Sequence, residues 1–237
     1  MKKYIIPASL AASALLSSCI NPINVIRRNI NVDNGPMTMI VVEAEDFTEI
    51  ETRDLFDIYY TQGPSKIELH VPEKVKDDVK VYVRNGKLSI GFAEDNNVNN
   101  VLVAKAYVSS PDLVKAETTG IGDIYINGNI KTETLNVTST GTGDCILDTV
   151  VGKNISLETF GTGDIEFNLI EASRIYLDTT GTGDVTGKNV NTNSLVLKTS
   201  GTGDISVAGK TEIVNCEETG TGDIKINRLK TSTIYKN

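Results

Sequence analysis

Six aspartates in this 237-residue chain recur about every 20 positions, which makes them the first candidates for chemistry. Stacked carboxylates repel one another unless something offsets their charge. Each carboxylate can accept backbone N–H groups within its own turn, or a row of Ca²⁺ ions can lie between the repeats. We expect the first arrangement, with no metal and no cofactor, because the known calcium-binding nonapeptide repeat has a different period. The column comprises Asp123, Asp144, Asp164, Asp184, Asp204 and Asp223.

No set of catalytic residues is evident in the rest of the sequence. His70 is the only histidine, so a Ser-His-Asp triad, a Cys-His pair or a multi-histidine zinc site would depend on that residue. The repeated Gly-x-Gly is typical of a phosphate cradle only where a helix follows, and none is predicted here. We therefore predict that the protein is not an enzyme. A solenoid carbohydrate-active enzyme is the least favoured alternative, because its paired carboxylates would lie in a cleft and not in regular columns.

The aspartates end a phrase, Gly-Thr-Gly-Asp, whose six copies begin 21, 20, 20, 20 and 19 residues apart. In the first copy, at Gly120, Ile121 replaces the threonine. A fixed period of this length indicates stacked, similar units that share one core. The predicted ladder of structural turns comprises Gly141, Gly143, Asp144, Gly161, Gly163, Asp164, Gly181, Gly183, Asp184, Gly201, Gly203, Asp204, Gly220, Gly222 and Asp223.

Apolar and polar residues alternate on both sides of each phrase, which predicts two short strands per repeat with one buried face. About 20 residues per repeat is typical of a single-stranded parallel β-helix, and parallel crossovers are overwhelmingly right-handed. We therefore predict an all-β, right-handed solenoid. The glycines should stand at a corner without room for a side chain and with access to positive φ. A second corner is expected near residues 127–129, 152–154 and 209–210.

The first half of the chain is less regular but also predicts strands, over 38–42, 56–61, 66–71, 79–83, 87–92 and 101–108, with one helical turn over 72–78. Such a segment is expected to cap the exposed end of a solenoid. We predict one domain over 36–237, with irregular coils over 36–110 and regular coils over 111–237.

The amino terminus is typical of a bacterial lipoprotein signal. Lys2 and Lys3 precede an apolar stretch, and Leu16-Ser17-Ser18 leads to Cys19. We predict a signal peptide over 1–18, a flexible tether over 19–35, and lipidation of Cys19 that anchors the chain in a membrane. An ordinary secretory peptide cut nearby is the alternative. The expected location is the cell envelope, at the outer membrane. The sequence does not indicate whether the protein faces the periplasm or the outside of the cell.

Composition excludes some partners. The chain has 23 basic and 31 acidic residues, a net charge of −8, which disfavours nucleic acid as a partner. Cys145 and Cys216 both occupy apolar columns about three to four repeats apart, too far for a disulfide, and are predicted to be buried apolar residues.

The segment FTEIETRDLFDIYYTQG, which begins at Phe47, and the repeated Ser/Thr-Gly-Thr-Gly-Asp-Ile resemble the bacterial head GIN domain family of auto-transporter adhesins. The resemblance runs from Phe47 to Ile226. It implies an adhesin role and brings no catalytic or ligand residues with it.

Two functions follow as hypotheses. The first is a non-enzymatic, lipid-anchored envelope protein that binds a glycan or another envelope protein through its β faces. The second is a structural envelope component without a ligand of its own. A cluster of exposed aromatic side chains on one face would favour the binding protein, and a uniformly polar surface would favour the structural role.

Overall fold

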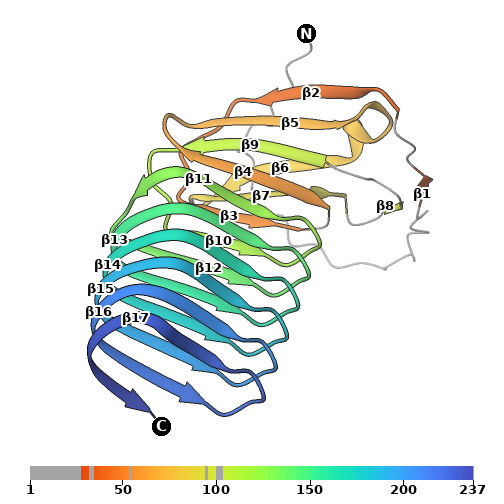
Figure 1. Cartoon of the computed structure of the whole chain (residues 1–237). Helices are drawn as coiled ribbons and strands as arrows, with labels where there is room; N and C mark the ends of the chain where they lie inside the picture. The colour runs from red at the N-terminus through yellow and green to blue at the C-terminus, as the bar shows by residue number, and fades with distance from the viewer. Residues whose placement is uncertain (1–27, 32–34, 54, 94–95, 100–103, 237) are drawn as a thin grey trace, which may run out of the picture.

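The computed structural model describes residues 28–31, 35–53, 55–93, 96–99 and 104–236, which form an all-β solenoid (Figure 1). The predicted signal peptide and Cys19 lie outside the described residues, as do 20–27 and 32–34 of the tether. Each regular coil starts after a Gly-Thr-Gly-Asp corner. The first regular coil contains two strands, β11 (Ile124–Lys131) and β12 (Thr134–Ser139). Each of the next five coils contains one long strand: β13 (Cys145–Thr159), β14 (Ile165–Thr179), β15 (Val185–Thr199), β16 (Ile205–Glu218) and β17 (Ile224–Lys236).

Successive coils pair in parallel, with Cys145 opposite Ile165, Ile165 opposite Val185 and Val185 opposite Ile205. The expectation of two short strands per coil is wrong from β13 onward, because one strand runs through the second corner. That corner is a bend, and small shifts of register accompany it in β11, β15 and β16. Gly128 and Gly209 lie at such bends with φ of 81° and 120°, a conformation that favours glycine.

The bend and the Gly-Thr-Gly-Asp corner divide the solenoid into two faces. Face A contains β4 (Phe56–Gln62), β11 and the first halves of β13 to β17, and face B contains β3 (Glu49–Thr52), β10 (Lys115–Thr118), β12 and the second halves. Face A continues through β9 (Ala104–Ser110) and β5 (Lys66–Pro72) to β2 (Met37–Val42), and face B through β7 (Lys87–Phe92) to β6 (Val79–Arg84).

The amino-terminal end differs from the coils because antiparallel pairs extend both faces there, β2–β5–β9 on face A and β6–β7 on face B. A 3₁₀ helix, η1 (Glu73–Asp78), connects β5 to β6 and buries Val75 completely. A separate parallel pair is formed by β1 (Arg28–Asn31) and β8 (Asn96–Asn99). The predicted helical turn and five of the six predicted strands thus match described elements closely, and the sixth matches from Ala104 onward.

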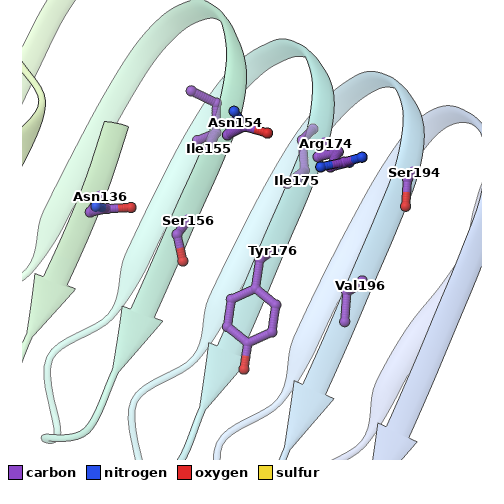
Figure 2. A pocket seen from close by; sticks show the side chains of 9 residues that line it. All are labelled: Asn136, Asn154, Ile155, Ser156, Arg174, Ile175, Tyr176, Ser194 and Val196. Carbon is purple, nitrogen blue, oxygen red and sulfur yellow. The ribbon is translucent and has the colours of Figure 1, made fainter. Parts of the chain in front are cut away.

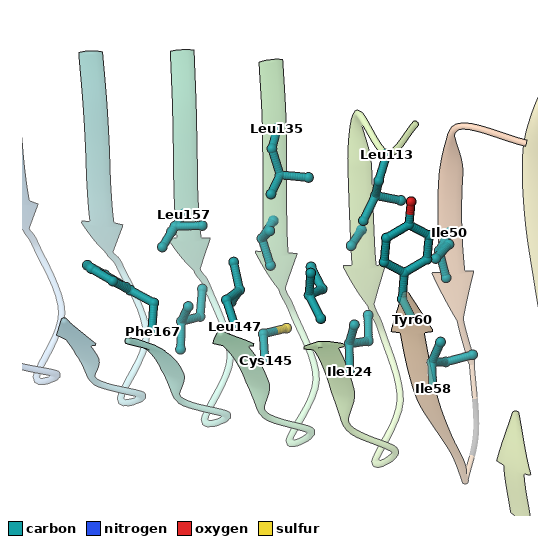
Figure 3. Close-up of a cluster of buried hydrophobic side chains, with 14 of the residues drawn as sticks. Ile50, Ile58, Tyr60, Leu113, Ile124, Leu135, Cys145, Leu147, Leu157 and Phe167 are labelled. Carbon is teal, nitrogen blue, oxygen red and sulfur yellow. The ribbon is translucent and has the colours of Figure 1, made fainter. Parts of the chain in front are cut away.

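The core is a continuous stack of inward side chains between the two faces (Figure 3). Cys145 lies in the column of Ile124 and Ile165, and Cys216 in the column of Leu197; both cysteines are buried and free, as predicted. Burial raises the pKa of the Cys145 thiol above its usual range.

Within the predicted irregular coils over 36–110, the structure contains a first coil that is in register with the regular repeats, which the sequence analysis did not identify. β3 pairs in register with β10, and β4 pairs with β11, so residues 49–62 form the same corner-and-strand unit as the repeats. Phe56 stands where the later coils have the second glycine, since a side chain on Gly122 would meet the Phe56 carbonyl oxygen. The corner has no Gly-Thr-Gly-Asp phrase, and so the period did not reveal it.

Candidate functional surfaces

The glycines of the phrase allow one corner to lie directly on the preceding one. A Cβ on Gly163 would lie 2.0 Å from the Gly143 carbonyl oxygen, and one on Gly161 would lie 2.0 Å from the Gly141 oxygen. The prediction that these corners have no room for a side chain is confirmed. The expectation of positive φ is wrong, because the glycines with positive φ in the described chain are Gly86, Gly128 and Gly209.

The aspartate column connects the coils. Asp164 donates its backbone N–H to Oδ1 of Asp144 at 2.8 Å, and Asp184 donates to Oδ1 of Asp164 at the same distance. The other four pairs repeat this bond, beginning with Asp123 on Asp57 of the first coil. Our expectation that each carboxylate would bond within its own turn is therefore wrong, since its partner is the next coil. The column holds neighbouring corners at a fixed spacing.

A second structural column, which the sequence analysis did not identify, lies inside each corner. The buried hydroxyl of Thr159 donates to the Gly163 carbonyl at 2.9 Å, and Ser139 bonds Gly143 at 3.0 Å. Thr52, Thr118, Thr179 and Thr199 make the same bond in their own coils. Glu218 takes this position in the sixth corner, and its carboxylate accepts the Ile224 N–H at 2.9 Å. The signal was present as a Ser/Thr column two residues before the phrase.

Neither column gathers the side chains that a metal site needs. Within the described part of the chain, no group of three or more His, Cys, Asp or Glu side chains is placed to hold a metal ion. His70 contacts Oε1 of Glu68 at 2.7 Å and lies edge-on to the Tyr107 ring at 5.0 Å, so its neighbours are a carboxylate and an aromatic ring on face A.

Face A carries a row of aromatic rings on its outer side. Tyr59 of β4 lies between Tyr107 of β9 and Tyr125 of β11, with centroid separations of 5.0 and 4.6 Å and interplanar angles of 20° and 4°. The Tyr125 hydroxyl donates to Oδ2 of Asp123 at 3.0 Å. Burial and this hydrogen bond raise the pKa of Tyr125 above its usual range, so the phenol stays protonated.

Apolar side chains of β2 lie beyond the row at the end of face A, with Glu68 and His70 of β5 between them and β9. On β2, the side chains of Met37, Met39 and Val41 are 55%, 61% and 56% exposed. Met39 lies opposite His70 of the neighbouring strand β5. We call the set Met37, Met39, Val41, His70, Tyr107, Tyr59 and Tyr125 the tyrosine surface.

The sequence analysis did not find the tyrosine surface, because its members come from five strands, four of them outside the regular repeats. One signal was present: Asp-Ile-Tyr occurs at both 57–59 and 123–125, which are equivalent positions of the first and second coils.

No helix in the described residues combines the length and apolarity that crossing a bilayer requires. The chain is similar to a crystal structure of a "putative adhesin" from Parabacteroides distasonis, with 19% identity, a TM-score of 0.75, and coverage of 89% of this chain and 100% of the other. A "putative adhesin" from Bacteroides fragilis has 19% identity, a TM-score of 0.62, and coverage of 88% and 100%.

A third similar structure, a "Putative lipid binding protein" from Parabacteroides distasonis, has 17% identity, a TM-score of 0.67, and coverage of 89% and 100%. At these identities the likeness concerns the fold alone. No curated protein matches the sequence. The family model described as "Putative auto-transporter adhesin, head GIN domain" matches residues 46–168 and 158–235. The chain therefore belongs to the head GIN domain family that this model describes.

Proposed function

We propose that this protein is a non-enzymatic, lipid-anchored adhesin of the cell envelope that binds a protein partner through the tyrosine surface. The stacked row of Tyr107, Tyr59 and Tyr125 is the observation that carries the proposal. Protein interfaces are enriched in tyrosine and methionine and depleted of acidic residues at their centre. A structural component without a ligand does not require such a surface, which includes three exposed apolar side chains of β2.

A protein partner fits this surface better than a sugar. A sugar ring packs its C–H face on an open aromatic face, but both faces of Tyr59 are covered by neighbouring tyrosines. The row offers ring edges, hydroxyl groups and the Met and Val side chains of β2, which suit the apolar centre and polar rim of a protein interface.

The surface is also rigid, which lowers the cost of binding. Tyr59, Tyr107 and Tyr125 lie on paired strands and fix one another by stacking, while Lys105 lies 5.2 Å from the Tyr59 ring centroid. Side chains that are already ordered lose little conformational entropy in a complex.

The role as an adhesin is tested with cells that lack the gene and are complemented with the wild type or with Tyr59→Ala/Tyr107→Ala/Tyr125→Ala. We expect the wild type to restore adherence to mucin-coated surfaces, epithelial monolayers or neighbouring cells, and the triple variant to fail at equal surface amounts. Tyr82→Ala is the matched control, because Tyr82 is 51% exposed on β6. Adherence that is unaffected by deletion of the gene would refute the role.

The anchor and its orientation are tested separately. We expect Cys19→Ala to abolish incorporation of labelled palmitate and to release the chain from membranes. Protease added to intact cells should cleave the anchored protein, since an adhesin must face outward. Persistent labelling of the variant would contradict the anchor, and full protection from protease would contradict the role as an adhesin.

A further inference from the structure

Face B has a shallow depression on its outer side, whereas the tyrosine surface lies on face A. It has a volume of about 250 Å³ and is crossed by β12, β13, β14 and the second half of β15 (Figure 2). Pockets that enclose small molecules usually measure about 300–1,000 Å³. The depression is therefore suited to one unit of a longer ligand that lies across the strands.

Hydrogen-bonding side chains line this depression. Arg174 lies in register between Asn154 and Ser194, and Asn136 lies beside Ser156. Within the described chain, no carboxylate forms an ion pair with Arg174, and the side chains of Asn136, Asn154 and Ser194 have no protein hydrogen-bond partner. The lining thus combines one positive charge with the free amides of Asn136 and Asn154 and the free Ser194 hydroxyl, while the Ser156 hydroxyl donates to Oε1 of Glu158 at 2.7 Å.

Tyr176 supplies the apolar part of the depression. Its neighbours in the same outward column are Ser156 and Val196 (Figure 2). These side chains are smaller than the tyrosines that flank Tyr59, so the Tyr176 ring has no stacked ring on either side. Its hydroxyl donates to Oδ2 of Asp178 at 2.6 Å, and Asp178 is only 7% exposed. This bond holds the ring along its strand, where a ligand can pack on it.

We propose that this depression is a subsite for an acidic saccharide, with the anionic group on Arg174 and a sugar C–H face on Tyr176. A guanidinium binds carboxylate or sulfate oxygens with paired hydrogen bonds. The amides of Asn136 and Asn154 can donate to and accept from sugar hydroxyl groups. The chain carries a net charge of −8, which weakens non-specific binding of anions, so the local arrangement must select the ligand.

The direction of the ligand follows from the strand spacing. Neighbouring strands lie roughly 4.8 Å apart, so an oligosaccharide that lies across the strands meets Asn154, Arg174 and Ser194 in turn. This inference shares with the proposed function only the premise that the protein acts by binding. It concerns face B, whereas the tyrosine surface lies on face A.

The test measures binding of the full chain, purified in mild detergent, to trigalacturonate, its fully methyl-esterified form, sialyllactose and a sulfated chondroitin tetrasaccharide. Saturation-transfer NMR and calorimetry give contact and affinity. We expect an acidic saccharide to bind, and Arg174→Gln and Tyr176→Ala each to weaken it about tenfold or more, as loss of a charged hydrogen bond or a packed ring implies. Carboxylate and sulfate ligands distinguish which anion Arg174 selects.

Two matched controls use β17. Tyr235 lies in the same outward column as Tyr176, three coils further on, and Arg228 is likewise exposed, so Tyr235→Ala and Arg228→Gln should leave affinity unchanged. Tyr107→Ala should also leave it unchanged, which separates this test from that of the proposed function. The proposal is overturned if no acidic saccharide binds, if the methyl ester binds as tightly as the acid, or if the Arg174 variant binds like the wild type.

Discussion

The first coil and the later coils build the same corner from different residues. In the later coils a glycine must stand against the preceding corner, because a Cβ on Gly143 would lie 2.1 Å from the Gly122 oxygen. In the first coil Phe56 occupies the equivalent position, is fully buried, and packs its ring 4.9 Å from that of Phe92. Thr52 still donates to the Phe56 carbonyl, and Asp57 still accepts from the next corner.

The difference shows which parts of the phrase the corner itself requires. The hydroxyl and the aspartate recur in both kinds of corner, so they belong to the corner. The glycine recurs only where another such corner lies directly before it. It is therefore a requirement of stacking.

The largest expected effect concerns a stacking glycine. Gly163→Val would force a Cβ to within 2.0 Å of the Gly143 oxygen, and backbone cannot move aside without separating two coils. We expect a loss of several kcal/mol or failure to fold. Gly63→Ala is the control, because no atom lies within 4 Å of its added Cβ. Equal melting temperatures for the two variants would show that the corners are not tightly stacked.

A large effect is also expected at the first corner. Phe56→Ala removes a fully buried ring and should cost about 3–5 kcal/mol in the free energy of unfolding. Phe56→Gly should be no more stable than Phe56→Ala, although glycine is the residue of the later corners. The Phe56 Cβ meets no preceding corner of this kind, so glycine relieves no clash there. If urea unfolding finds Phe56→Gly as stable as the wild type, the comparison between the corners fails.

A smaller effect tests what the corners share. Thr159→Val keeps the shape of the side chain but leaves the Gly163 carbonyl without its donor, which should cost about 1–3 kcal/mol. Thr159→Ser keeps the hydroxyl, as Ser139 does in the preceding coil, and should cost less. Chemical denaturation of both variants decides this, and equal losses would assign the column to packing alone.

The period of the phrase was sufficient to predict the solenoid, the buried cysteines and the crowded glycines, because each coil repeats one pattern of burial. It could not predict the first coil, where Phe56 breaks the phrase, or that one strand continues through the second corner expected near residues 152–154. The bonding of the aspartates was also mispredicted, because the sequence shows that carboxylates are stacked but not which N–H lies opposite each one. The tyrosine surface and the Arg174 depression depend on register between strands, which emerges only in the folded chain.

The smallest expected effects compare two members of the aspartate column, Asp144 and Asp204. Burial raises the pKa of Asp144 although it accepts the Asp164 N–H, so ionisation opposes folding there. The Asp223 N–H and the Lys225 ammonium lower the pKa of Asp204, so ionisation favours folding. Asn keeps one acceptor oxygen and removes the charge. At pH 7 we therefore expect Asp144→Asn to melt at or above the wild-type temperature and Asp204→Asn to melt below it.

The pH dependence of the stability of these two variants shows whether ionisation of each carboxylate favours or opposes folding. The stability that ionised Asp204 supplies is present above the unfolded pKa, near 3.8, and is lost as the pH falls through its lower folded pKa. The deficit of Asp204→Asn should thus shrink in acid. The cost of ionising Asp144 appears as the pH rises through its raised folded pKa, so the gain of Asp144→Asn should also vanish in acid. Melting curves between pH 3 and 7 that moved both variants in the same direction would show that the column acts as one uniform charge, and not as carboxylates set apart by burial and by Lys225.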